Sequence, residues 1–194
     1  MEDYLRFENI TKYYPGVTAL DNVSISFRQG EVHALMGANG AGKSTLIKIL
    51  SGAERPSRGS IYFCGKKHVE FDPHTALGLG IGVVYQENNL VPSLSVMENI
   101  FLGHWPGGRL TVNKHEMRSK SIELLGQFNI EIDPDTEVGE LSPAYQQIVE
   151  IVRVISRPLK VLVLDEPTAP LTVAEVDILF DIIAKLKAQG LTII

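Results

Sequence analysis

Nine consecutive residues, 37–45, have types and a spacing that suit phosphate chemistry. They read GANGAGKST, a glycine and four further residues followed by glycine, lysine and a hydroxyl-bearing residue. Glycines permit backbone angles that turn successive N–H groups toward one point, and a helix beginning near Lys43 adds the positive end of its dipole. This pattern predicts a phosphate-binding loop rather than a flexible turn before a helix. The predicted nucleotide contacts are Gly37, Ala38, Asn39, Gly40, Ala41, Gly42, Lys43, Ser44 and Thr45.

An acidic pair follows a second run that could position it. Residues 161–164, VLVL, form a continuous apolar run, as expected of a parallel strand covered on both faces, and Asp165 and Glu166 come directly after it. Ligands of α/β sheets bind at the carboxyl ends of the strands. Asp165 is therefore predicted to hold Mg²⁺ together with the Ser44 hydroxyl, and Glu166 to polarise an attacking water. The alternative is that the pair only begins a solvated loop. A functional site is the better interpretation, because the same chain has a phosphate-binding loop.

The elements around these residues indicate an α/β core. EVHALM, residues 31–36, predicts a strand that leads into the phosphate loop, and the helix after the loop is expected to stop at Gly52. The alternating VSISF and GSIYFCG predict antiparallel strands, whereas the continuous IGVVY and LTII predict further parallel ones.

Helical patterns dominate the region between Gln86 and Lys160. Asn113 with Glu116, and later Thr172 with Glu175, are typical of helix starts. Apolar faces are then expected on three helices, formed by Met117, Leu124, Leu125 and Phe128, by Ile148, Ile151, Val152 and Ile155, and by Val176, Leu179, Phe180 and Ile183.

Composition narrows the possible functions. The 194 residues carry a formal charge of −5 without a basic cluster, which argues against a nucleic-acid groove or a lipid-headgroup surface. Cys64 is the single cysteine, so no internal disulfide can form. We expect a cytosolic chain, because MEDYLRF is no signal peptide and no apolar run reaches about 18 residues. The final GLTII reads as the start of a strand, which predicts a truncated domain.

Four runs, in their order and spacing, resemble the nucleotide-binding domain of an ATP-binding cassette (ABC) transporter. They are GANGAGKST, VVYQENNLVPSLSVMENIFLG, LSPAYQQIVEI and VLVLDEPTAPLT. YPGVTALDNVS and PTAPLT are most similar to the ATP-binding subunits of bacterial monosaccharide importers of the ribose, galactose and xylose type. The resemblance implies an α/β P-loop NTPase (RecA-like) core with an N-terminal antiparallel β layer and an inserted α-helical subdomain. It divides the single domain 1–194 into a catalytic core, 1–86 and 158–194, and a helical subdomain, 87–157.

The resemblance also implies roles for residues outside the phosphate loop. Tyr14 would stack on adenine, although Tyr13 could take this role or Tyr14 could pack on the core. Gln86 would reach Mg²⁺ and water, which makes Lys43, Gln86 and Glu166 the catalytic set. The signature segment, which in the family faces the ATP of a partner domain, would be Leu141, Ser142, Pro143, Ala144, Tyr145 and Gln146. Pro143, Ala144 and Tyr145 replace the usual two glycines and glutamine, but Ser142 still suits a helix N-cap and Pro143 the first turn.

By the same resemblance the chain would bind Mg·ATP and hydrolyse it to energise sugar uptake. Its partners would be transmembrane permease subunits, a second ABC domain and, indirectly, a solute-binding protein, at the cytoplasmic face of the inner membrane and without nucleic acid. The family's switch histidine follows the strand that starts at LTII, so no residue here takes that role and slow hydrolysis is expected. Two alternatives stay open. One is a soluble ABC ATPase acting on DNA or the ribosome, and the other is a nucleotide-dependent regulatory module whose altered signature does not support catalysis.

Overall fold

The computed structural model describes residues 4–87, 89–108, 111–169 and 171–194. Asn88 and Pro170, which belong to two of the quoted runs, lie outside the described residues. Contacts between Cα atoms divide the chain into two compact units. Unit 1 comprises Met1–Val83, Leu159–Asp165 and Leu186–Ile194, and unit 2 comprises Val84–Pro158 and Glu166–Lys185.

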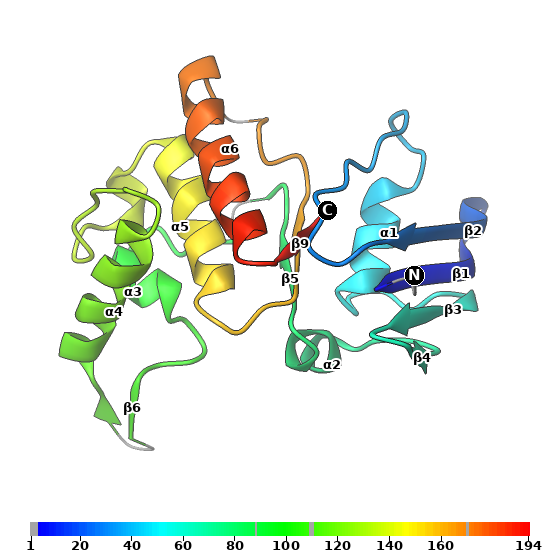
Figure 1. Cartoon of the computed structure of the whole chain (residues 1–194), viewed down its shortest axis with the longest axis horizontal. Coiled ribbons are helices and arrows are strands. Elements are labelled where there is room, and N and C mark those ends of the chain that lie inside the picture. The colour runs from blue at the N-terminus through cyan, green and yellow to red at the C-terminus, as the bar shows by residue number, and fades with distance from the viewer. Residues whose placement is uncertain (1–3, 88, 109–110, 170) are drawn as a thin grey trace. The chain divides into compact units, whose positions relative to one another are not determined.

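Unit 1 contains a four-stranded antiparallel sheet that confirms the alternating pattern (Figure 1). Its strands, in the order β2-β1-β3-β4, are β1 (Leu5–Tyr14), β2 (Val17–Phe27), β3 (Arg58–Phe63) and β4 (Lys66–His68). Phe7 of β1 lies opposite Ile25 of β2 and Ile61 of β3 in the ladder. Helix α1 (Lys43–Leu50) contacts β2 and buries the apolar side chains of Leu46, Ile47, Ile49 and Leu50.

A second sheet has the order β5-β8-β9 and carries the continuous apolar runs. Its strands are β5 (Ile81–Val84), which follows the short helix α2 (Pro73–Gly78), β8 (Val161–Leu164) and β9 (Thr192–Ile193). β8 and β9 pair in parallel, and the side chains of 161–163 are buried. This is the pattern expected of strands covered on both faces.

The strand predicted for residues 31–36 is reduced to a single bridge. Val32 pairs in parallel with Ile193, whose carbonyl accepts a hydrogen bond from the His33 N–H at 2.8 Å. The Ile193 N–H donates in turn to Glu31 O at 2.9 Å. β9, the neighbour of this segment, is only two residues long, and residues 34–36 therefore have no ladder partner among the described residues.

Unit 2 is mainly helical. It contains α3 (Val96–Ile100), the two-stranded β6 (Gly107–Gly108) and β7 (Thr111–Val112), α4 (Lys114–Gly126), the 3₁₀ turn η1 (Val138–Glu140), α5 (Pro143–Ile155) and most of α6 (Val173–Ala188). α3 contacts both α4 and α5. Two predicted helix starts are confirmed: Asn113 Oδ1 accepts from the Glu116 N–H, and Glu175 accepts from the N–H and hydroxyl of Thr172. No helix within the described ranges is both long and apolar enough to cross a bilayer.

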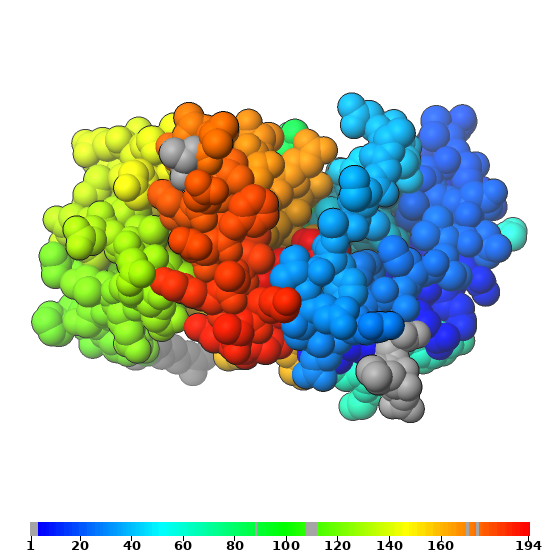
Figure 2. All heavy atoms as spheres, turned by 45° about the horizontal axis from the view of Figure 1, so that its top comes forward, coloured from blue at the N-terminus to red at the C-terminus, as the bar shows by residue number. Residues whose placement is uncertain are grey.

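The apolar face predicted for α6 is confirmed at Leu179 and wrong at Phe180. Leu179, Ile182 and Leu186 are buried, whereas Phe180 is 57% exposed. The outer surface of α6, coloured orange to red, is open on the face shown in Figure 2. Two neighbouring stripes of this helix are apolar, so the sequence period alone could not decide which of them faces the protein.

Candidate functional site

The phosphate loop ends in a glycine that opens α1 without a side-chain cap. Gly42 is the N-cap with φ 91° and ψ 8°, and no side chain bonds the first turn of this helix. The Gly42 carbonyl accepts from Leu46 N at 2.9 Å, so the helix proper starts here. The N–H groups of a first helical turn have no partner within the helix, and the helix dipole places positive charge at them. The start of α1 therefore has the donors and the polarity that an anion needs.

Lys43 closes the loop in this structure. Its Nζ donates to Gly37 O at 2.8 Å and to Ala38 O at 3.1 Å. Ala41 N also donates to Ala38 O, at 3.1 Å, which tightens the turn. Among the described residues no carboxylate lies within ion-pair distance of Lys43, so its positive charge is not neutralised by the protein. Neutral carbonyls are weaker partners for an ammonium group than phosphate oxygens would be.

Strand β2 lies close to the last glycine of the phosphate loop. A Cβ added to Gly42 would lie 2.5 Å from Ala19 O and 2.6 Å from Leu20 Cδ2. Gly40 also has a positive φ, 81°, but a Cβ there would meet no atom within 4 Å. Gly42 is thus required both by its backbone angle and by a close approach, and Gly40 by its angle alone.

Tyr14 lies at the end of β1 and is partly exposed. The Lys12 ammonium lies 5.0 Å from the centre of its ring, and the same ammonium forms an ion pair with Glu54 at 2.8 Å. The Lys12 hydrogen bond is the main cause that lowers the pKa of the Glu54 carboxyl. Tyr13 is more exposed than Tyr14 and pairs with Thr18 in the hairpin. Both candidate rings for the adenine therefore remain accessible in this part of unit 1.

The acidic pair emerges at the carboxyl end of β8, as predicted. Asp165 is half-buried and Glu166 is exposed. Glu166 has φ 49°, a left-handed backbone that is uncommon for residues other than glycine. Its carbonyl accepts from Ala169 N at 3.2 Å, so the chain turns sharply just after the strand. Such an angle costs of order 1 kcal/mol and is concentrated at functional sites.

The segment after β5 holds Gln86 at the surface. Gln86 is exposed, and Asn89 Nδ2 donates to Glu87 O at 3.0 Å just beyond it. The fully buried Asn99 of α3 then ties down the next stretch. Its Oδ1 accepts from Val91 N at 2.8 Å, and its Nδ2 donates to the carbonyls of Val91, Leu94 and Ser95.

The signature segment forms the start of α5 in the predicted way. Ser142 is the N-cap and Pro143 the first helical residue, and Tyr145 N donates to Ser142 Oγ at a long 3.5 Å. No capping box closes, because position three is Tyr145. The Gln146 side chain donates to Val138 O at 3.2 Å and to Leu141 O at 3.1 Å, which binds the helix start to η1. Ser142 therefore keeps an exposed hydroxyl at a helix N-terminus.

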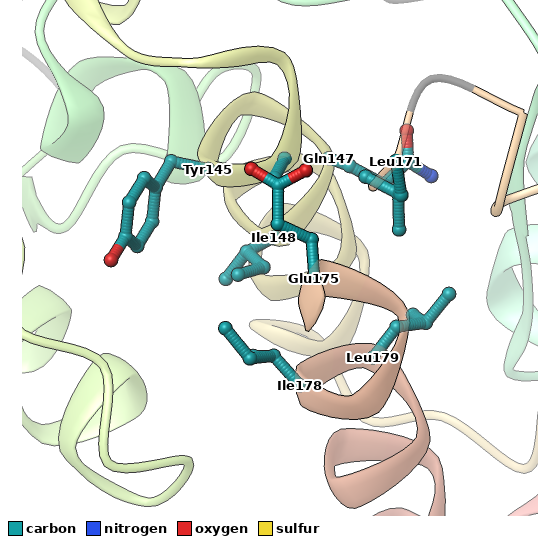
Figure 3. A pocket seen from close by; sticks show the side chains of 8 residues that line it. Tyr145, Gln147, Ile148, Leu171, Glu175, Ile178 and Leu179 are labelled. Carbon is teal, nitrogen blue, oxygen red and sulfur yellow. The ribbon is translucent and has the colours of Figure 1, made fainter. Parts of the chain in front are cut away.

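Two of the replaced signature residues line a cavity of about 100 Å³ between α5 and α6 (Figure 3). The buried Ala144 and the part-exposed Tyr145 contribute from α5, and Ile178 and Leu179 face the same space from α6. Glu175 lies at the start of α6 beside it. A glycine in place of Ala144 would remove apolar surface from this cavity. Ala144, which stands where the family signature usually has glycine, therefore adds packing to the helix start.

The structure distributes the predicted site residues over both units. Tyr14, the phosphate loop 37–45 and Asp165 belong to unit 1, whereas Gln86, Glu166 and the signature residues 141–146 belong to unit 2. Sequence reasoning missed the buried Glu150 of α5. An acidic residue inside the apolar run IVEIV is the signal that could have identified it.

A family model described as "ABC transporter" matches residues 20–169. The chain belongs to the ABC transporter family. Two relatives illustrate the match. The arabinose import ATP-binding protein AraG of Chromohalobacter salexigens is 47% identical over 190 residues, which is 97% of this chain and 38% of that protein. The galactofuranose transporter ATP-binding protein YtfR of Escherichia coli K12 is 44% identical over 193 residues, which is 100% of this chain and 39% of that protein.

The predicted ABC fold is confirmed by a solved structure. The dimeric post-hydrolysis cassette MJ0796, bound to ADP and Pi, matches with a TM-score of 0.83 at 28% identity, covering 97% of this chain and 85% of that one. The family model and the two sugar-transport relatives confirm the family resemblance that the motifs predicted. The chain spans less than two fifths of the length of the two sugar-transport relatives.

Proposed function

We propose that this chain binds Mg·ATP and hydrolyses it to energise the uptake of a sugar through an ABC importer. The observation that carries the nucleotide part is the uncapped start of α1 at Gly42, beside a Lys43 whose charge meets only loop carbonyls. The sugar part is supported by the relatives, which are named for arabinose import and galactofuranose transport. A monosaccharide is therefore the proposed class of transported solute.

ATP would be held by Lys43, by the backbone N–H groups at the start of α1 and by an aromatic ring of β1. Lys43 would exchange the carbonyls of Gly37 and Ala38 for the β- and γ-phosphates, since charge-assisted bonds to phosphate are stronger. The first-turn N–H groups of α1 would donate to the same oxygens. Tyr14, at the end of β1, would offer a ring face to adenine.

Three oxygen-bearing side chains suit Mg²⁺. They belong to Ser44, Gln86 and Asp165, and oxygen ligands are what this ion prefers. None of these side chains takes part in the hydrogen bonds of the described residues, so their oxygens are open to a ligand. When bound, Mg²⁺ would neutralise charge that develops on the phosphates.

Glu166 is the proposed base for the attacking water. Its exposed carboxylate stands on the left-handed turn directly after Asp165, a strained backbone that fits a functional position. The Glu166 carboxylate would accept the proton of a water aimed in line at the γ-phosphate.

The signature residues imply a second ABC domain. Ser142 lies at the start of α5 with an exposed hydroxyl, and in our proposal it meets the γ-phosphate bound by a partner domain. ATP would then close the pair of domains. Permease subunits at the cytoplasmic face of the inner membrane would receive that movement, and a solute-binding protein would deliver the sugar to them.

Single-turnover hydrolysis tests this assignment. The chain is mixed in excess over ATP with Mg²⁺, and phosphate release is followed for the unsubstituted protein and for Glu166→Gln. We expect the variant to bind ATP as before and to release phosphate more slowly by about 100-fold or more, the usual contribution of a general base. Glu175→Gln, a change to another carboxylate of unit 2, is the matched control and should release phosphate normally. Equal rates for Glu166→Gln and the unsubstituted chain would remove Glu166 from its role.

A further inference from the structure

Lys12 of β1 is a lysine whose ammonium group the fold holds in one place. Only 12% of its side chain is exposed. Its Nζ donates to Glu54 Oε2 and to the carbonyl oxygen of Arg55, both at 2.8 Å. The same Nζ lies over the ring of Tyr14, 5.0 Å from the ring centre. An ammonium group has three N–H donors, and two of them are used on these two oxygens. The cation is therefore fixed over one face of Tyr14.

The residues that hold Lys12 follow the helix that begins at the phosphate loop. The Glu54 N–H donates to Lys48 O at 3.0 Å, so Glu54 is bonded to the last turn of α1. α1 has 8 residues, which is about 12 Å along its axis. Lys12 thus connects the ring of Tyr14 to the end of α1, and the start of the same helix belongs to the phosphate loop. All these residues lie in unit 1.

The backbone in this part of β1 is held by other bonds. Ser57 N donates to Thr11 O at 2.8 Å, and Tyr13 N donates to Ser57 Oγ at 3.0 Å. β1 also pairs with β2 as far as Tyr14. None of these bonds involves the side chain of Lys12. Loss of the ammonium group should therefore free the Tyr14 ring without displacing the strand.

We propose that Lys12 is a positioning residue for the base of ATP. Its ammonium group occupies one face of the Tyr14 ring, and the adenine stacks on the other face. A cation is attracted by the negative face of an aromatic ring, most strongly where water is largely excluded, as around this mostly buried lysine. The ring is thus oriented before ATP arrives. Such orientation raises affinity, because binding does not have to immobilise the side chain.

This inference rests on the proposed function, namely that ATP binds and that a ring at the end of β1 stacks on its base. It also chooses between the two candidate rings, since within the described chain a cation lies over Tyr14 and none over Tyr13. The competing explanation is a direct attraction between the Lys12 ammonium and the triphosphate. That attraction would not depend on the Tyr14 ring and would act on a phosphate chain without a base.

The test is a double-mutant cycle on ATP affinity, measured by calorimetry with Mg²⁺ on the whole chain. Lys12→Met removes the charge and keeps an unbranched side chain. It should weaken ATP binding about fivefold, the change made when one more side chain must be immobilised on binding. In the Tyr14→Leu background the same substitution should have no further effect, because there is no ring to orient. Lys12→Arg keeps a cation that can lie over the ring, so it should retain most of the affinity.

Two controls accompany the cycle. Arg6→Met removes another cation of β1 that lies over a tyrosine, 4.3 Å from the ring centre of Tyr62 and 3.5 Å from the carboxylate of Glu8. This variant should bind ATP normally. Inorganic tripolyphosphate is the ligand without a base, and its affinity should be the same for Lys12→Met and the unsubstituted chain.

The outcomes separate the two hypotheses. An unsubstituted chain that binds no ATP refutes the proposed function and with it the positioning of a base. ATP binding by the unsubstituted chain with unchanged affinity in Lys12→Met overturns the positioning role alone. An equal loss with and without the Tyr14 ring, or a parallel loss for tripolyphosphate, also overturns it. Should Lys12→Met fail to fold, Glu54→Ala carries the same comparison, because it releases Lys12 by a change to a side chain that is 33% exposed.

Discussion

The two glycines of the phosphate loop should respond differently to the same substitution. Gly40 and Gly42 both have a positive φ, 81° and 91°, so alanine at either position is held in a backbone it avoids. Their surroundings differ. A Cβ at Gly42 would lie 2.5 Å from Ala19 O and 2.6 Å from Leu20 Cδ2, and a Cβ at Gly40 would meet nothing within 4 Å.

The geometry gives the size of the difference. Placing an L side chain in the left-handed region costs about 1 kcal/mol, which is the whole expected effect of Gly40→Ala. In Gly42→Ala the overlap with β2 adds about 2 kcal/mol, typical of overpacking against atoms that cannot easily move. We therefore expect a loss of about 3 kcal/mol in the free energy of unfolding for Gly42→Ala. The resulting difference in Tm between the two variants should be about 4–8 °C.

Thermal and urea unfolding followed by circular dichroism measure this difference, and Gly40→Ala serves as the matched control. The Gly42→Ala protein should show the lower Tm and the lower urea midpoint. Equal losses in the two variants would refute the reasoning, because they would mean that β2 does not press against the loop in solution.

Two further predictions concern the remaining elements. The hydrogen bonds from Ser95 lower the pKa of the Glu98 carboxyl, and Lys114 adds to this effect. Glu98 therefore stabilises the fold at pH values above the ordinary glutamate pKa of about 4.3. This stabilisation is lost as the pH falls through the lowered pKa of Glu98 in the folded protein. Thermal unfolding should accordingly show Glu98→Gln less stable than the unsubstituted chain at pH 7 and equal to it in acid, and a constant difference would contradict this assignment. On α6, Ile182→Ala should cost about 2–4 kcal/mol in urea unfolding and Phe180→Ala under about 1 kcal/mol, since only Ile182 is buried. A larger loss for Phe180→Ala than for Ile182→Ala would contradict this prediction, because it would mean that Phe180 is buried as the sequence pattern indicates.

Local chemistry made much of the fold predictable. The alternation in VSISF and the continuous VLVL run identified the two kinds of sheet. Apolar and polar residues alternate along a strand where only one face is buried, and a strand covered on both faces is apolar throughout. Ser142 and Pro143 identified the start of α5 in the same way, since the N-cap and first turn have requirements that few residues meet. The phosphate loop was predictable because its glycines, lysine and serine stand together in the chain.

Features that depend on distant neighbours could not be read from the sequence. Residues 31–36 look like a strand, but their ladder is limited by the two residues of β9. Phe180 belongs to an apolar stripe that the fold leaves exposed. The hydrogen bond from Arg153 Nη1 to Asn89 O joins positions 64 residues apart, so no local rule reveals it.

ATP binding by the chain and by Lys43→Ala is the measurement that tests the central claim most directly. In calorimetric titrations with Mg²⁺ the unsubstituted chain should bind ATP, and Lys43→Ala should show no tight binding, because its loop loses the ammonium group that meets the phosphates. Lys48→Ala, a change to the exposed lysine of the same helix, should bind ATP normally. Unchanged affinity in Lys43→Ala would contradict the account.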